Sequence, residues 1–184
     1  LDTASAVDLD YGAERRLLVL RQGALMLRTA HGDARPLLVQ SAQGTVQALG
    51  TVFTVRQFDG RTRVGVVEGQ VRLAPRAGAA RTLATGLSAD FDAAGVAEPN
   101  VPAHPSQAWA EGVLYADDWR LDDVVRELGR YRAGILRCDP AVAGLRLSGA
   151  FQLDDTDAAL LAVARSLPVS VVYRTRYWVT LTAA

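Results

Sequence analysis

Three prolines within nine residues divide this chain into two halves with different sequence patterns. They lie in residues 99–107, Pro-Asn-Val-Pro-Ala-His-Pro-Ser-Gln. Proline fixes φ and has no amide proton, so neither a helix nor a central strand is expected to pass through. The sequence therefore predicts a multi-domain chain, with an N-terminal domain over 1–98, a proline-rich linker over 99–107 and a C-terminal domain over 108–184.

The overall composition is that of a folded, electrically balanced protein. The chain is 49% hydrophobic, and 20 basic residues, all of them arginine, are interleaved with 20 acidic ones. A nucleic-acid partner is therefore not expected, because such proteins usually show a clustered basic face. Cys138 has no second cysteine to pair with and is expected to be a partly buried small side chain. No apolar run is long enough to span a bilayer and no signal peptide opens the chain, which starts at Leu1 without Met; we expect a piece of a longer protein, with any anchor upstream.

The first half predicts an all-β domain. Short alternating or apolar runs are separated by turn pairs such as Gln22-Gly23, Asp59-Gly60 and Glu68-Gly69, where glycine allows a positive φ. This pattern is typical of a hairpin-rich sandwich, roll or short solenoid of antiparallel strands. The expected strands are 16–20, 24–29, 37–41, 45–49, 51–57, 62–67, 70–73, 81–84 and 87–91.

The second half predicts an α+β module with the order β-α-β-β-α-β-β. A strand over 112–116 precedes a helix with an apolar stripe, which Asp118 is expected to cap and Gly134 to end. Strands over 135–138 and 145–151 follow, then a second helix that opens at Asp154 or Asp155 and stops at Pro168. Strands over 169–173 and 177–181 close the module. The expected inner positions of the two helices are Leu121, Val124, Val125, Leu128 and Tyr131, then Ala158, Leu161, Ala162, Ala164 and Leu167.

Residues for covalent chemistry or metal binding are scarce, so neither an enzyme nor a cofactor is expected. The two histidines, His31 and His104, have no partners at ligand spacing. Ser148 and Ser166 lack a nucleophile motif, and no phosphate-binding loop is present. The acidic pairs 117/118, 122/123 and 154/155 fall near expected helix starts, where caps and dipole partners belong. Trp109, Tyr115 and Trp119 fit either core packing or an exposed contact patch.

Two motifs in the first half resemble the β domain of FecR-type regulators. They are Ala48-Leu-Gly-Thr-Val-Phe-Thr-Val55 and Val66-Val-Glu-Gly-Gln-Val71, and the likeness covers most of residues 9–98. In the second half, the segments 109–115, 121–125, 130–131, 145–151 and 157–167 resemble the module that follows in these regulators. That module is similar to the short N-terminal domain shared by secretins and TonB-dependent transducers.

The resemblance implies the periplasmic sensor of a single-pass inner-membrane anti-sigma regulator. Its implied partners are the N-terminal signalling domain of an outer-membrane TonB-dependent transducer and, through an upstream cytoplasmic segment, an extracytoplasmic-function sigma factor. Siderophore or iron uptake is the implied context, and no small-molecule substrate is expected. The alternative is a cell-envelope structural or glycan-binding module; a glycan site needs exposed aromatics, and the β half has only Tyr11, Phe53, Phe58 and Phe91.

We expect the partner to dock by adding a strand to a free sheet edge of the second module. The first candidate is the short run Ile135, Leu136, Arg137, Cys138 and Asp139, and the second is Leu145, Arg146, Leu147 and Ser148. Arg137 and Arg146 would add contacts to partner carboxylates. The competing interpretation is that these two runs pair with each other as a hairpin.

Overall fold

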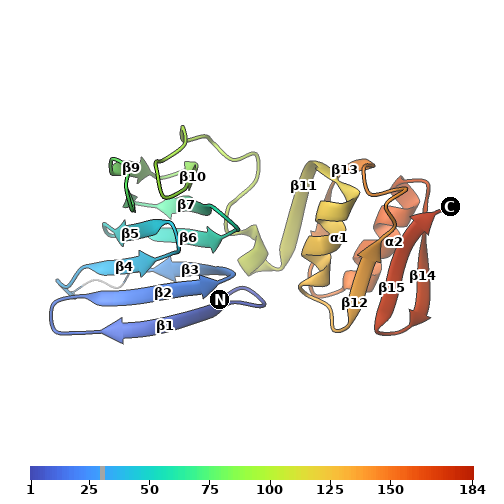
Figure 1. Cartoon of the computed structure of the whole chain (residues 1–184), viewed down its shortest axis with the longest axis horizontal. Helices are drawn as coiled ribbons and strands as arrows, with labels where there is room; N and C mark the ends of the chain where they lie inside the picture. Colours follow the sequence, from blue (N-terminus) through green and yellow to red (C-terminus); the bar gives the residue numbers. More distant parts are fainter. Residues whose placement is uncertain (30–31) are drawn as a thin grey trace. The chain divides into compact units, whose positions relative to one another are not determined.

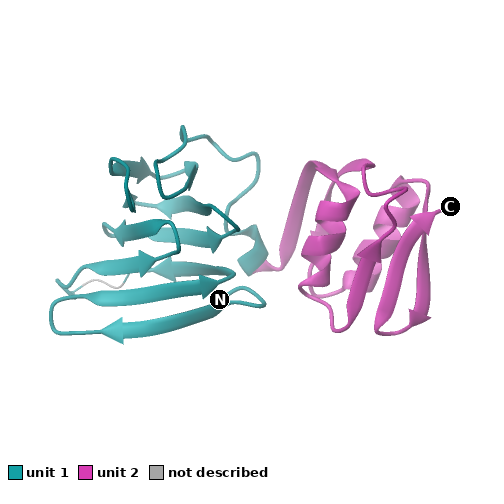
Figure 2. Ribbon diagram, in the orientation of Figure 1, with its two compact units in different colours: residues 1–110 teal, residues 111–184 magenta. Residues whose placement is uncertain are grey.

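The computed structural model describes residues 1–29 and 32–184. The chain divides into two compact units, Leu1–Ala110 and Glu111–Ala184 (Figure 2). Residues 99–107, the expected linker, cluster with the first unit, where Ser88 and Asn100 exchange two backbone hydrogen bonds of 2.8 and 2.9 Å. His31 lies outside the described residues.

The first unit consists of two β-sheets (Figure 1). The six-stranded sheet has the order β1-β2-β4-β5-β8-β9, with bounds Ala6–Tyr11, Arg16–Gln22, Leu37–Gln40, Gly44–Ala48, Gln70–Pro75 and Arg81–Ala84. The four-stranded sheet has the order β10-β7-β6-β3, with bounds Ser88–Phe91, Thr62–Glu68, Val52–Gln57 and Ala24–Arg28. The prediction of antiparallel hairpins holds for most neighbours, but β2 and β4 pair in parallel because β3 between them leaves for the other sheet.

Glycines lie where the chain passes from one sheet to the other. Gly23 joins β2 to β3, Gly50 precedes β6, Gly69 joins β7 to β8 and Gly86 precedes β10, with φ of 84°, 75°, 77° and 79°. An L-residue with a Cβ rarely adopts this conformation, so glycine makes these sharp corners possible.

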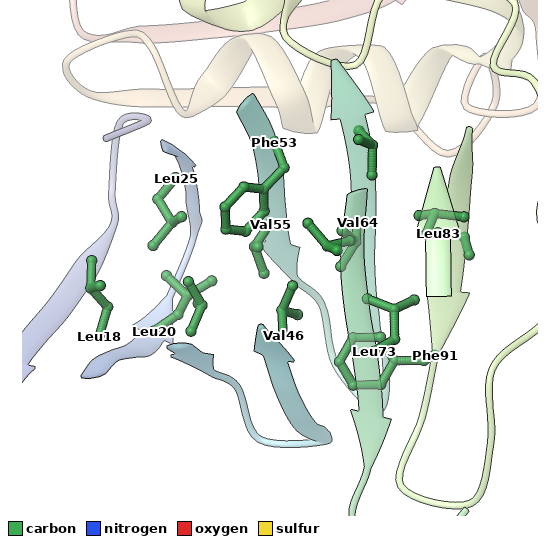
Figure 3. Packing of buried hydrophobic residues seen from close by; sticks show 14 of the residues in the cluster. Leu18, Leu20, Leu25, Val46, Phe53, Val55, Val64, Leu73, Leu83 and Phe91 are labelled. Carbon is green, nitrogen blue, oxygen red and sulfur yellow. The ribbon is translucent and has the colours of Figure 1, made fainter. Parts of the chain in front are cut away.

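The two sheets share one hydrophobic core (Figure 3). Leu20, Val46 and Leu73 from the six-stranded sheet meet Phe53 and Val64 from the four-stranded sheet, and each is at most 2% exposed. The strands therefore bury alternate residues against the opposite sheet, as their period-two pattern predicts.

The second unit has the predicted element order. A 3-10 turn, η1 (Ala108–Glu111), precedes β11, and β11 pairs with β13 in a two-stranded sheet. A three-stranded sheet has the order β12-β15-β14. Both α1 and α2 contact a strand of each sheet. The bounds are β11 Val113–Arg120, α1 Leu121–Gly129, β12 Ile135–Cys138, β13 Arg146–Gln152, α2 Thr156–Ser166, β14 Val169–Thr175 and β15 Trp178–Ala183.

Three local predictions in this unit are wrong. Asp118 does not cap α1; it lies in β11 with φ 53°, at an irregularity between Ala116 and Trp119, and Arg120 takes the N-cap position without a side-chain bond. Gly134 does not end α1, because Arg130 and Tyr131 donate back to Glu127 and Leu128 and close the helix earlier.

The third error concerns the buried face of α2. Its buried residues are Thr156, Ala159, Leu160 and Val163, whereas Leu161 is 49% exposed. An alanine-rich helix offers two stripes of nearly equal hydrophobicity, so its periodicity does not select one. Of the two candidates, Asp154 and Asp155, Asp155 caps this helix, since its carboxylate accepts from the Ala158 amide at 2.9 Å.

Candidate functional site

Strand β12 lies at an edge of the three-stranded sheet. It pairs in parallel with β15, and no other strand among residues 1–29 and 32–184 is hydrogen-bonded to it. The hairpin interpretation is wrong, because β13 pairs with β11 in the other sheet. The first candidate run therefore has one unpaired strand margin, the property that strand addition requires.

The direction of the backbone groups shows which residues line this margin. The amides of Ile135 and Asp139 donate to the carbonyls of Tyr177 and Leu181, at 2.7 and 2.9 Å. Successive residues of a strand point their N–H and C=O groups to opposite sides, so those of Leu136 and Cys138 point away from β15. An added strand would bond to the backbone of these two residues.

Two contacts hold the segment before β12 against the rest of the unit. Arg132, whose side chain is 8% exposed, contacts Asp157 Oδ1 at 2.5 Å and the Arg176 carbonyl at 2.9 Å. Gly134 has φ 103°, and a Cβ there would overlap the carbonyl oxygen of Tyr177. Arg132 and Gly134 thus position the start of β12 beside the β14–β15 turn.

The Arg132 contact also sets the protonation of its neighbours. Burial works to raise the pKa of Asp157, but hydrogen bonds from Arg132 and Tyr173 and the guanidinium charge outweigh it and hold the pKa below its ordinary 3.8. Burial, with the hydrogen bond to Asp157, raises the pKa of Tyr173. Asp157 therefore stays ionised and Tyr173 stays a neutral donor at neutral pH.

The side chain of Cys138 is half-buried on the inner face of the three-stranded sheet. Burial, with the charges of Asp122 and Asp139, raises the pKa of its thiol. The thiol is therefore protonated at neutral pH and acts as a small partly buried side chain, as predicted.

The second candidate run is engaged in internal contacts. Arg146 donates to the carbonyl and carboxylate of Asp118 at 2.6 and 2.8 Å, and Ser148 Oγ accepts from the Asp118 amide at 2.8 Å. Both backbone groups of Leu145 are bonded, to Leu121 and Val142, and Leu147 is buried. Strand β13 also pairs with only one of the described strands, β11, but Arg146 and Ser148 hold the irregularity in β11, so β12 is the better candidate.

The sequence prediction missed Trp178, which is exposed beside this edge. Val179 and Leu181 of β15 are fully buried, so the alternate residue Trp178 lies on the opposite, outer face of the sheet. Ile135 is its neighbour in the register and is also exposed. The signal in the sequence was a tryptophan near the start of a strand that follows two arginines, Arg174 and Arg176.

The remaining candidates have structural explanations. Asp122 and Asp123 pair with Arg120 and Arg126, and hydrogen bonding to Arg120 lowers the pKa of Asp122. Within the described part of the chain, no group of metal-ligand side chains is found, and no helix is long and apolar enough to cross a membrane. Trp109, Tyr115 and Trp119 are all half-buried.

The aromatic residues of the β half do not form an exposed stacking surface. Phe53 and Phe91 are in the core, and Phe58 lies under the guanidiniums of Arg61 and Arg56 at 4.6 and 5.0 Å. Tyr11 is exposed at the end of β1, which is an edge strand of the six-stranded sheet. Nothing here favours the glycan-binding alternative.

Comparison with known protein families gives a match in the first unit. Residues 1–72 match the family model described as FecR protein, and this range contains both sequence motifs. Residues 1–72 are thus similar to FecR proteins. No curated protein matches the chain in sequence.

Two solved structures of a proposed anti-sigma factor from Parabacteroides distasonis ATCC 8503, at 1.65 and 2.50 Å resolution, share the fold. They superimpose with TM-scores of 0.81 and 0.80 at 20% identity, over 100% of this chain and 89% and 88% of theirs. The fold of this chain thus occurs in another protein.

Proposed function

We propose that this chain is the periplasmic sensor region of a FecR-type anti-sigma regulator and that β12 receives a partner strand. The partner is the N-terminal signalling domain of an outer-membrane TonB-dependent transducer. Binding is relayed through an upstream membrane helix and cytoplasmic segment to an extracytoplasmic-function sigma factor. The regulator performs no chemistry of its own.

The observation that carries the proposal is the unpaired backbone of Leu136 and Cys138. β12 pairs on one side only, and its outward N–H and C=O groups are arranged to continue the sheet. Main-chain hydrogen bonds of this kind supply affinity in strand-addition complexes. The similarity of residues 1–72 to FecR proteins and the anti-sigma relatives of the same fold support the regulatory context.

A proline at position 136 tests this edge. Leu136→Pro removes an N–H that faces away from β15, so the sheet's own ladder stays complete. Leu136→Ala is the matched control, because it removes the same side chain and keeps the N–H. We expect titration with the signalling domain of the co-encoded transducer to show at least tenfold weaker binding for Leu136→Pro than for Leu136→Ala.

A second proline variant checks the assigned direction of the backbone. Arg137→Pro removes an N–H on the β15 side and should lower the melting temperature, whereas Leu136→Pro should lower it less. Equal affinity of the Leu136→Pro and Leu136→Ala proteins, both folded by circular dichroism, would reject β12 as the docking edge.

A further inference from the structure

Within the strands of the three-stranded sheet, all charged side chains are positive. β12, β15 and β14 contain no Asp or Glu, while Arg137 and Arg174 extend from this face and Arg176 lies in the turn beside it. None of the three guanidiniums forms an ion pair with a residue that the structure describes. The chain as a whole is neutral, so this is a local excess of cations.

The ring of Trp178 contacts two of these guanidinium groups. The Cζ atoms of Arg137 and Arg174 lie 5.6 and 5.2 Å from the centroid of its ring. A guanidinium held against an aromatic ring keeps its N–H donors free at its edge, in the fork geometry that matches a carboxylate. We call Arg137, Trp178 and Arg174 the arginine–tryptophan stack.

The stack lies next to the backbone edge that the partner strand would use. Ile135 and Arg137 project from the outer face, whereas Leu136 and Cys138 present their backbone groups at the margin. Every second side chain of an added strand would lie on the outer face, about 5 Å from its neighbour on β12. Two such side chains would lie beside Ile135 and Arg137.

We propose that the arginine–tryptophan stack binds a carboxylate of the docked strand. The partner strand then carries Asp or Glu beside Arg137 and an apolar residue two positions away beside Ile135. Ile135 is 45% exposed, which leaves apolar surface for that second side chain to cover. This inference rests on the proposed function, because it describes the outward face of the same strand.

Charge reversal of the stack tests the inference with the whole chain. The test variant is Arg137→Glu/Arg174→Glu. The control is Arg72→Glu/Arg165→Glu, which changes the net charge equally at two exposed arginines that are not part of this sheet. The probe is the signalling domain of the co-encoded transducer, titrated at low and moderate salt.

We expect the test variant to bind at least tenfold more weakly than the unaltered chain and the control less than threefold more weakly. Replacing the partner's acidic residue by Arg should restore binding to the single variant Arg137→Glu. Circular dichroism melting curves would establish that each variant is folded.

The outcomes separate the two proposals. Weak binding of Leu136→Pro with normal binding of the charge-reversed chain would keep the edge and overturn the stack as an acidic-strand site. Absence of binding by the unaltered chain would overturn both. A third outcome is that the unaltered chain binds phosphatidylglycerol vesicles and the charge-reversed chain does not, while both bind the signalling domain equally. That outcome would assign the face to a membrane and overturn the inference.

Discussion

Gly69 lies at the corner between β7 and β8, and a Cβ there would overlap the carbonyl oxygen of Gly50. These two glycines belong to the two FecR motifs, so the motifs meet at one corner of the fold. Thr51 strengthens this corner: its amide donates to Thr29 Oγ1 at 2.7 Å and its hydroxyl donates to the Glu68 carbonyl. The motifs therefore encode a packing arrangement of the backbone.

Substitution of Gly69 tests that interpretation. Gly60 has a similar positive φ of 72°, but a Cβ there meets nothing within 4 Å. Gly60→Ala should cost about 1 kcal/mol, from the left-handed backbone alone. Gly69→Ala should cost about 2 kcal/mol more because the corner must open. Urea unfolding of both variants measures the difference, and equal losses of stability would contradict the corner contact.

The Arg132–Asp157–Tyr173 contact predicts a pH dependence of stability. The pKa of Asp157 is lowered in the folded chain, so its contribution is fully present above its ordinary value of 3.8 and is lost as pH falls through the folded pKa. Asp157→Asn should therefore melt at a lower temperature than the unaltered chain at pH 7. That difference should shrink as the pH is lowered from 3.8 through the folded pKa. A difference that does not change with pH would show that the carboxylate charge contributes nothing.

The sequence predicted which residues are structural better than which contacts they make. The capping of α2 by Asp155, one of its two candidate residues, follows from local rules and is confirmed. The role of Asp118 was wrong because its partners, Arg146 and Ser148, come from a strand distant in sequence. Trp178 was missed for the same reason, since Arg137 approaches it only through the pairing of β12 with β15.

At the scale of elements, helix α2 shows the limit of periodicity as a guide. Leu160 is fully buried and Leu161 is 49% exposed, although either fits a helical stripe. Leu160→Ala should cost about 3 kcal/mol through loss of buried surface and the cavity that remains. Leu161→Ala should change the free energy of unfolding by less than about 0.5 kcal/mol. Denaturant titration of the two variants measures these losses of stability. A larger loss for Leu161→Ala than for Leu160→Ala would support the buried face first expected from the sequence.

Strand order is the part of the fold that local pattern could not supply. The sequence indicated every strand of the second unit within a few residues, since alternation and turn residues are local properties. The parallel pairing of β12 with β15 joins segments separated by a helix and two strands, and no local signal encodes it. The edge position of β12 was expected because this run is short and lies between Gly134 and Pro140. The sheet to which β12 belongs was not predicted.

At the scale of the whole molecule, the two units divide the work in the proposed function. The first contains the segment similar to FecR proteins and a continuous core built by two sheets, and its motif residues serve packing. The second carries β12 and the arginine–tryptophan stack. Partner recognition is thus assigned to residues 111–184.

This assignment predicts that the second unit binds the partner by itself. Its buried residues, including Leu121, Leu128, Leu160, Val179 and Leu181, form contacts within the unit, so residues 111–184 should fold alone. A unit of fewer than about 80 residues is expected to have only about 3–5 kcal/mol of stability. The measurements are the amide NMR spectrum of this fragment and its affinity for the co-encoded signalling domain, with residues 1–110 as the control fragment. We expect fragment 111–184 to bind within threefold of the whole chain and fragment 1–110 not to bind. Binding by 1–110, or a folded 111–184 that does not bind, would move the recognition surface to the first unit.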